Sequence, residues 1–142
     1  MAERPAGLDR FLAAQGDVYH AALAELQSGT KLSHWMWFVF PQIAGLGRSH
    51  TAQFYAIRDR AEAEAYLAHP QLGERLREST LALLHWAGKR SAEGILGPVD
   101  ALKFKSSMTL FAEVSGDADP FAQALDSFFD GERDDATIEL LT

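Results

Sequence analysis

One stretch, residues 33–42 with the sequence SHWMWFVFPQ, constrains the fold more than any other part of this chain. It contains two of the three tryptophans and an unbroken run of six bulky apolar residues from Trp35 to Phe40. Neither the helical period of 3.6 residues nor the strand period of two gives such a run a polar face. We therefore expect the segment to be buried on several sides at the centre of the core. Its composition is compatible with a helix and with a buried strand.

Length and composition are those of one ordinary globular domain covering residues 1–142. A chain of 142 residues can bury a sizeable core without metal or disulfide support. The formal net charge of −7 argues against general nucleic-acid binding, which relies on clustered lysine and arginine. Cysteine is absent, which excludes thiolate chemistry and fits a cytoplasmic location. Residues 1–7 are expected to form a loose tail, and no apolar run reaches the roughly 20 residues of a membrane span.

Helix signals recur from end to end and predict an all-α fold, a single compact domain of about eight short helices. Apolar residues recur at helical spacing, and a proline that suits a first helical turn, Pro98, precedes the segment 99–114. Polar residues that suit N-cap positions precede several of the expected helices; they are Asp17, Ser33, Ser49, Asp59, Asp119, and Asp134 or Asp135.

His34 is the first candidate for chemistry because it directly precedes the apolar block. A histidine partly desolvated by tryptophans can act as an acid or base near neutral pH, or bind a ligand. The alternative is a histidine at the edge of the core, bonded to a backbone carbonyl. Gln42 ends the block with an amide that can point into a cleft or cap a backbone group. Trp35 and Trp37 are candidates for a wall of that cleft, and the alternative is that both are only core.

Arg48 follows the glycine-rich segment 45–47, with the sequence GLG. Backbone N–H groups in such a turn, beside a guanidinium, can form a cradle for an anion. The alternative is an ordinary turn followed by a surface arginine.

Lys103 and Lys105 are the cations of a second candidate anion site. On a helix, Lys103 shares a face with Ser106 and Ser107, at i+3 and i+4. No acidic residue occurs in the segment 101–112, so neither lysine has an obvious partner within the interior of its own helix. This pattern predicts a phosphate or carboxylate site. The alternative is that the lysines reach solvent or bind acids elsewhere in the chain.

Metal and cofactor motifs are absent from the sequence. The five histidines show no H-x-x-x-H or H-E-x-x-H spacing, and there is no Walker loop, G-x-G-x-x-G or G-x-S-x-G motif. We therefore predict no metal site and no cofactor. The acidic C-terminal region is interpreted as a solvated face.

The chain resembles an uncharacterised bacterial family, domain of unknown function 1810. The resemblance runs from about Leu8 to Leu141 and rests on the motifs at residues 33–42, 45–47, 66–70, 97–103 and 106–111. It implies a small, mostly helical protein and supplies no established activity. Some members carry a calpastatin label, yet nothing in this chain resembles a disordered inhibitor repeat. A fainter likeness, to helical N-glycosidases acting on ADP-ribose-type substrates, rests on helical character and residues 128–131, and lacks the early glutamate of that family.

These patterns predict a small anionic ligand in a cleft beside residues 33–42, with a nucleotide-like ligand as one form of the hypothesis. Hydrolytic or N-glycosidic activity stays open, with His34 as the candidate acid or base. The expected ligand contacts are Trp35, Trp37, Gln42, Arg48, Lys103, Ser106 and Ser107. The alternative is a non-enzymatic interaction module whose aromatic block is only core and whose acidic surface meets a basic partner. The ligand hypothesis requires His34 and Lys103 to converge on one concave pocket. The sequence leaves the oligomeric state open.

Overall fold

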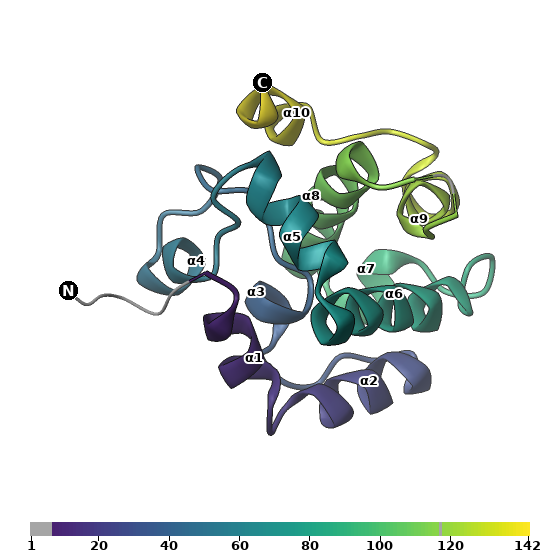
Figure 1. Cartoon of the computed structure of the whole chain (residues 1–142). Coiled ribbons are helices and arrows are strands. Elements are labelled where there is room, and N and C mark those ends of the chain that lie inside the picture. The colour runs from purple at the N-terminus through teal and green to yellow at the C-terminus, as the bar shows by residue number, and fades with distance from the viewer. Residues whose placement is uncertain (1–6, 117) are drawn as a thin grey trace.

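The computed structural model describes residues 7–116 and 118–142, which contain ten helices joined by short connections (Figure 1). They are α1 (Asp9–Gln15), α2 (Tyr19–Ser28), α3 (Met36–Val39), α4 (His50–Phe54), α5 (Arg60–Ala68), α6 (Pro70–Leu84), α7 (Ala92–Leu96), α8 (Pro98–Val114), α9 (Phe121–Phe129) and α10 (Asp135–Leu141). The predicted all-α class is confirmed, with ten helices in these residues rather than about eight. Of the predicted tail at residues 1–7, all but Gly7 lies outside the described residues.

Helix α8 is the centre of the arrangement. Helices α5, α7, α9 and α10 all pack against it, and α2 packs against α6. Figure 1 shows α10 above α8 at one end of the molecule and α2 along α6 at the other. Because α8 is covered from several directions, most of its surface is buried, and eight of its residues belong to the interior.

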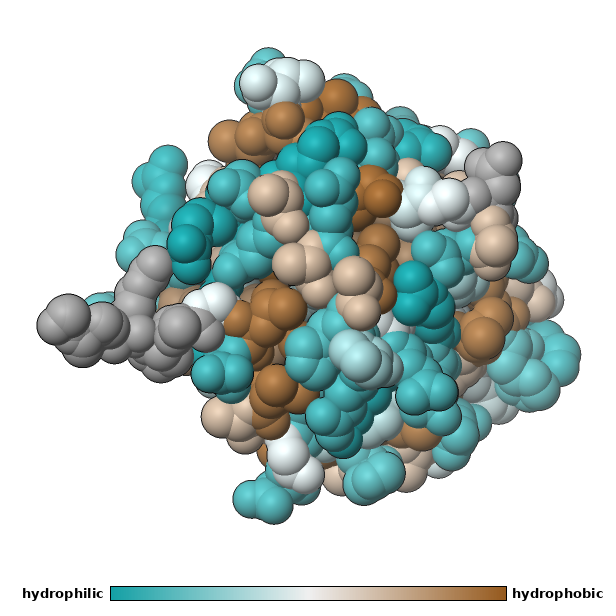
Figure 2. All heavy atoms as spheres, in the orientation of Figure 1, coloured by the Kyte–Doolittle hydropathy of each residue, from teal (hydrophilic) through white to brown (hydrophobic). Residues whose placement is uncertain are grey.

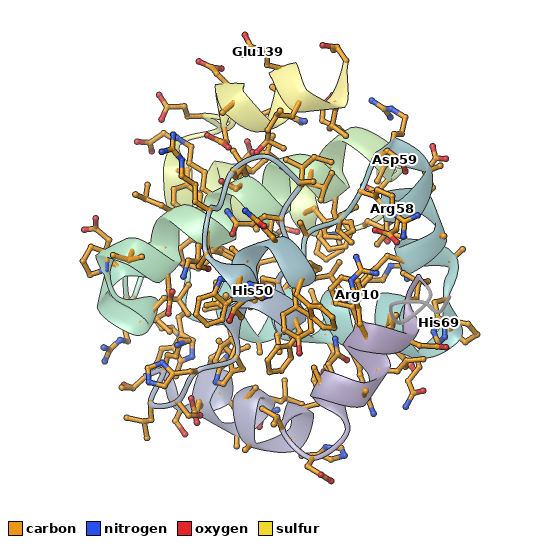
Figure 3. All side chains as sticks on the ribbon, turned by 90° about the vertical axis from the view of Figure 1, so that its left-hand side faces the viewer. Arg10, His50, Arg58, Asp59, His69 and Glu139 are labelled. Carbon is orange, nitrogen blue, oxygen red and sulfur yellow. The ribbon has the colours of Figure 1, made fainter. Side chains whose placement is uncertain are left out.

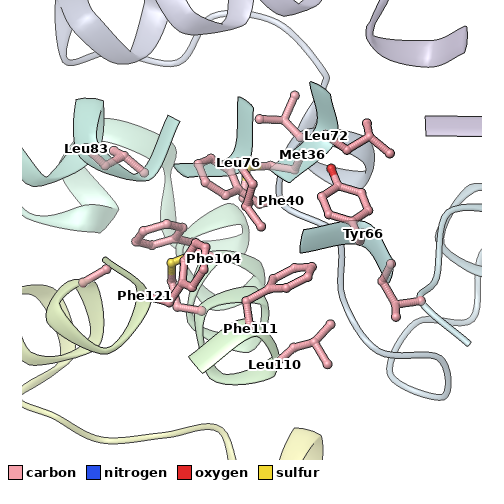
Figure 4. Packing of buried hydrophobic residues seen from close by; sticks show 14 of the residues in the cluster. Met36, Phe40, Tyr66, Leu72, Leu76, Leu83, Phe104, Leu110, Phe111 and Phe121 are labelled. Atoms are coloured by element: carbon pink, nitrogen blue, oxygen red, sulfur yellow. The ribbon is translucent and has the colours of Figure 1, made fainter. Parts of the chain in front are cut away.

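The aromatic block lies in this interior, as its composition predicts. Its residues Met36 to Val39 form the single helical turn α3, which answers the choice between helix and strand. Trp35 and Phe40, on either side of that turn, are fully buried. The ring of Phe40 meets Phe104 of α8 edge to face, with centroids 5.0 Å apart, and Figure 4 shows this contact within the core. Burying each large aromatic side chain stabilises the fold by roughly 1.5–3 kcal/mol.

Three of the predicted helix starts are capped as expected. In each case the polar side chain at the N-cap accepts a hydrogen bond from the backbone N–H three residues later: Ser49 from Ala52, Asp59 from Glu62 and Asp134 from Thr137. Local sequence is sufficient at these positions because donor and acceptor belong to the same helical turn.

Three other predicted caps are wrong because tertiary contacts take the side chain or move the helix start. Helix α2 begins after Val18, which provides no side-chain cap, so Asp17 is not the N-cap. The hydroxyl of Ser33 binds a carboxylate on α2 instead of capping the aromatic block. Asp119 forms an ion pair with Arg77 on α6, 2.6 Å from its Nε, and the N-cap position of α9 is Pro120, with no side-chain cap.

The motif at residues 66–70 stabilises the fold through hydrogen bonds of Tyr66 and His69. The hydroxyl of Tyr66 accepts a hydrogen bond from the buried amide of Gln15, which also donates to the carbonyl of Phe38. Burial raises the pKa of Tyr66, so its hydroxyl stays protonated. The ring nitrogen Nδ1 of His69 accepts hydrogen bonds from the first two backbone N–H groups of α6 and so caps that helix.

Arg10 joins α1 to the start of α5 through a largely buried guanidinium. It donates to the carbonyl oxygens of Phe54 and Ala56, both at 2.7 Å, and lies 3.1 Å from the carboxylate of Glu62. Figure 3 shows Arg10 on α1 beneath Arg58, at the beginning of α5. Burial alone raises the pKa of Glu62, yet the hydrogen bonds and charge of Arg10 outweigh it and hold that pKa below its ordinary value.

The visible surface is mainly polar. In Figure 2 hydrophilic side chains cover most of this face, and apolar residues form separate patches between them. Within residues 7–116 and 118–142, no helix is long and apolar enough to cross a membrane.

Candidate functional site

A hollow of about 280 Å³ lies beside the N-terminus of α8. This volume is close to the lower end of the range for small-molecule sites, roughly 300–1,000 Å³. Its walls come from the segment before and within α3, from the α7–α8 junction and from the first turns of α8. The residues that line it are Lys31, His34, Trp35, Met36, Trp37, Leu96, Gly97, Pro98, Val99, Asp100 and Lys103.

A glycine and a proline form the α7–α8 junction beside the hollow. Gly97 ends α7 and immediately precedes α8, with φ of 89°, a conformation that residues with a Cβ rarely adopt. Pro98 follows as the first residue of α8. The segment before α3 is tied to this junction because the N–H of Lys31 donates to the carbonyl of Ile95 at 2.8 Å.

Three charged side chains meet at the hollow. The carboxylate of Asp100 lies 2.8 Å from the ammonium of Lys31 and 3.3 Å from that of Lys103. The side chain of Lys31 is only 7% exposed. Both ammonium groups also lie over indole rings, at 5.1 Å from the centroid of Trp35 and 4.3 Å from that of Trp37. The cluster carries a net charge of +1, next to the positive end of the α8 dipole.

His34 lies on the exposed rim of the hollow, in a loop that one carboxylate of α2 organises. Glu25 accepts hydrogen bonds from the N–H groups of Leu32 and Ser33 at 2.8 and 3.0 Å, and from the hydroxyl of Ser33 at 2.6 Å. The indole N–H of Trp35 also donates to Glu25, at 2.9 Å. Burial by itself raises the pKa of Glu25, but these hydrogen bonds outweigh it and lower the pKa to about 2.

Replacing Glu25 with glutamine is expected to reduce the free energy of unfolding at pH 7 by about 2 kcal/mol, because charge-assisted hydrogen bonds are replaced by weaker ones. The pKa of Glu25 is lower in the folded state than its ordinary value of 4.5. Its contribution is therefore complete above pH 4.5 and is lost as the pH falls towards 2. Urea unfolding at several pH values measures this. The exposed Glu64→Gln serves as the control, and a stability difference that does not shrink on acidification contradicts the assignment.

The structure brings some of the predicted site residues together at the hollow. His34, Trp37 and Lys103 line it with accessible surface. Trp35 borders it too, but its side chain is fully buried, so it supports the wall from behind. His34 and Lys103 therefore meet the geometric requirement of the ligand hypothesis.

Four predicted ligand contacts do not line the hollow: Ser106, Ser107, Gln42 and Arg48. The hydroxyl of Ser106 donates to Asp134 at 3.0 Å and helps to hold α10 against α8. Ser107 is fully buried. The carbonyl of Gln42 accepts the N–H of Ile57 at 2.8 Å, beside the isolated bridge between residues 43 and 57.

Arg48 is exposed and does not line the hollow, and the glycines before it lie in close contact with other parts of the protein. A Cβ on Gly45 would lie 3.1 Å from the side chain of Leu140 in α10. A Cβ on Gly47 would lie 2.5 Å from that of Ala52. The turn is thus shaped by close contacts within the protein.

The interpretation of Lys103 and Lys105 as cations without partners is wrong. Lys103 pairs with Asp100 on its own helix, and Lys105 lies 2.6 Å from the carboxylate of Glu132. Sequence reasoning also missed Lys31 and Asp100 as members of the site. Asp100 could have been found, since it precedes Lys103 by three residues, a spacing that places both on one helix face. Nothing near Lys31 in the sequence indicates its partner on α8.

Residues 128–131, which carry the likeness to N-glycosidases, are not among those that line the hollow. The rings of Phe128 and Phe129 each pack 6.1 Å from Phe104. Asp130 adopts a left-handed conformation, with φ of 55°, and ends α9. Among the described residues, no group of three or more histidine, aspartate or glutamate side chains is placed to hold a metal ion.

The fold and the hollow define a small all-α protein with a charged candidate site between α3 and α8. Residues 5–141 match the family described as "Protein of unknown function (DUF1810)", and the chain belongs to this family. The structure is similar to the crystal structure of the conserved hypothetical protein Rv1873 from Mycobacterium tuberculosis, with a TM-score of 0.91 and 47% sequence identity. That match covers 97% of this chain and 98% of the other. A comparison with curated proteins found no match.

Proposed function

We propose that this protein binds a small anionic ligand in the hollow beside α8. The observation that carries the proposal is the convergence of Lys31 and Lys103 on one concave, largely apolar space. These lysines come from segments far apart in the sequence, and His34 adds a third group that can donate a hydrogen bond to an anion.

The charge of the cluster supports an anion as the ligand. Lysine is almost never buried unless it is paired, and the side chain of Lys31 is 7% exposed. The carboxylate of Asp100 can balance only one of the two ammonium groups that touch it. A bound anion completes the balance in a place where apolar walls reduce the screening by water.

Trp37 has a positioning role in this arrangement. The ammonium of Lys103 lies over its ring, 4.3 Å from the centroid, and occupies one face. The indole therefore restrains the ammonium of Lys103 at the hollow, which both residues line.

Lys103→Met is expected to abolish ligand binding while the fold persists. A ligand at a hundred times its Kd stabilises the native state by about 2.7 kcal/mol, which corresponds to roughly 8 °C in Tm for a chain of this size. A thermal-shift screen with cyclic AMP, indole-3-acetate and AMP measures this. Lys105→Met is the matched control, because Lys105 lies on the same helix and pairs with Glu132. A screen without any shift at millimolar ligand contradicts the proposal.

His34→Ala is expected to raise the Kd of the ligand about tenfold and so to reduce the increase in Tm on binding. A lost hydrogen bond to a charged group costs about 1.5 kcal/mol or more. Because His34 is exposed, the variant should keep the wild-type Tm without ligand. If the ligand is turned over, His34 is the candidate acid or base, and hydrolysis or N-glycosidic cleavage would stop in this variant. A variant that unfolds instead assigns His34 a structural role.

An interaction module remains the second candidate because apolar side chains are exposed close to the hollow. Val99 is 65% exposed and Leu102 is 67% exposed, both in the first turns of α8. Leu32, beside His34, is 79% exposed. A negative ligand screen would favour this candidate.

A further inference from the structure

We infer that the ligand is a compact monoanion with an apolar or aromatic body, a carboxylate or a phosphodiester, and that Asp100 sets this preference. The inference rests on the proposed function and names the chemical class that the same hollow accepts.

The charge of the cluster favours a monoanion. Two ammonium groups and one carboxylate leave the cluster at +1 while His34 is neutral. A monoanion neutralises this charge. A dianion such as a phosphate monoester leaves one negative charge in excess, beside the carboxylate of Asp100 and against apolar walls, where like charges repel more strongly than in water.

The size of the hollow and the chemistry of its walls favour a ligand with an apolar body. A volume of about 280 Å³ holds a mononucleotide-sized molecule or a smaller one. Met36, Leu96, Pro98 and Val99 make much of the lining apolar. A ligand with a hydrophobic body gains burial there, whereas a small, strongly hydrated anion loses its water without compensation.

Asp100 has a fixed position between the two lysines. Its carboxylate oxygens each face a different lysine, at 2.8 and 3.3 Å, so the carboxylate stays between them. The dipole of α8 alone favours an acid in the first helical turn. It does not require that acid to face two lysines at the edge of a hollow, and this arrangement places a negative charge beside any bound anion.

The test compares ligands that differ mainly in charge, by calorimetry at pH 8, where histidines are largely neutral. Cyclic AMP is the phosphodiester monoanion, AMP the dianion and adenosine the neutral analogue; indole-3-acetate and indole form the carboxylate pair. The wild-type protein should bind at least one monoanion about tenfold more tightly than its dianionic or neutral analogue. Which monoanion binds better distinguishes the carboxylate from the phosphodiester.

Asp100→Asn keeps the shape and raises the charge of the cluster to +2. We expect this variant to bind AMP about tenfold more tightly than the wild type does, so that the preference shifts towards the dianion. Lys103→Gln changes the cluster to neutral and should lose the tight binding of monoanions. This variant provides a second measurement should Asp100→Asn fold poorly. Glu64→Gln, which removes one negative charge from α5, a helix that does not line the hollow, should leave the selectivity unchanged.

Each outcome has one meaning. If none of these probes binds, the proposed anion site itself fails. If the wild-type protein binds AMP as tightly as cyclic AMP, and indole as tightly as indole-3-acetate, the monoanion inference is overturned while an anion site persists. If Asp100→Asn binds ligands with unchanged selectivity, the assignment to Asp100 is overturned.

Discussion

Arg10→Met is expected to lower the free energy of unfolding by about 4 kcal/mol. Removing one partner of a buried ion pair costs roughly 3–5 kcal/mol, because the remaining charge has no compensation. Here the carboxylate of Glu62, whose side chain is only 10% exposed, would keep only the weaker ion pair with the exposed Arg58, 3.6 Å away. The carbonyl groups of Phe54 and Ala56, both bonded to the guanidinium at 2.7 Å, would lose a donor as well. Equilibrium unfolding in urea measures the loss.

A double-mutant cycle separates the ion pair from general packing. Arg10→Met combined with Glu62→Leu removes both charges and should recover at least about 1 kcal/mol relative to Arg10→Met alone. Arg58→Met is the control, since the side chain of Arg58 is 54% exposed and its guanidinium lies 3.6 Å from the same carboxylate. We expect that control to cost less than about 1 kcal/mol. Equal losses for the two arginines would contradict the importance of the buried pair.

Gly73→Ala is expected to destabilise the protein by about 3 kcal/mol, although the same change within a helix ordinarily stabilises it. A Cβ on Gly73 would lie 2.2 Å from the carbonyl oxygen of Leu67 and 2.9 Å from the carbonyl carbon. These are backbone atoms at the end of α5, so no side chain can turn away to make room. The start of α6 would have to move from α5, which disturbs the core around Leu72.

Gly16→Ala is the matched control for this substitution. The nearest atom to a Cβ at Gly16 is a backbone oxygen at 3.6 Å, an ordinary contact, and its φ is −46°. That change should leave the stability within about 0.5 kcal/mol or raise it slightly. Thermal unfolding of the two variants provides the comparison. Similar Tm values would show that α5 and α6 can separate without cost.

Local signals predicted the helices well because their causes are local. The caps at Ser49 and Asp59 and the proline at the start of α8 act within one helical turn. Asp119 shows the limit of such reasoning. Its sequence context is that of an N-cap, yet Arg77 on another helix binds it more strongly. Sequence pattern cannot weigh a local hydrogen bond against an ion pair that exists only after folding.

The candidate site was predictable only in part, because its residues come from separate segments whose contacts form on folding. His34, Trp37 and Lys103 were found from their own segments, and all three line the hollow. The spacing of Lys103 and Ser107 places both on one helix face, and the sequence predicts that both contact the ligand. Helix α8 is instead covered by α5, α7, α9 and α10, so its hydroxyl-bearing turns face protein rather than solvent. A helix covered from several directions has no single exposed stripe for the sequence to reveal.

The hydrogen bonds to Glu25 have a consequence for the motion of the loop before α3. The N–H groups of Leu32 and Ser33 belong to exposed residues outside any helix, where amide protons usually exchange quickly with solvent. A single carboxylate holds both, so the rim that carries His34 should resist local opening as a helical turn does. A ligand would then meet a wall that is already ordered, and little conformational entropy would be lost when it binds.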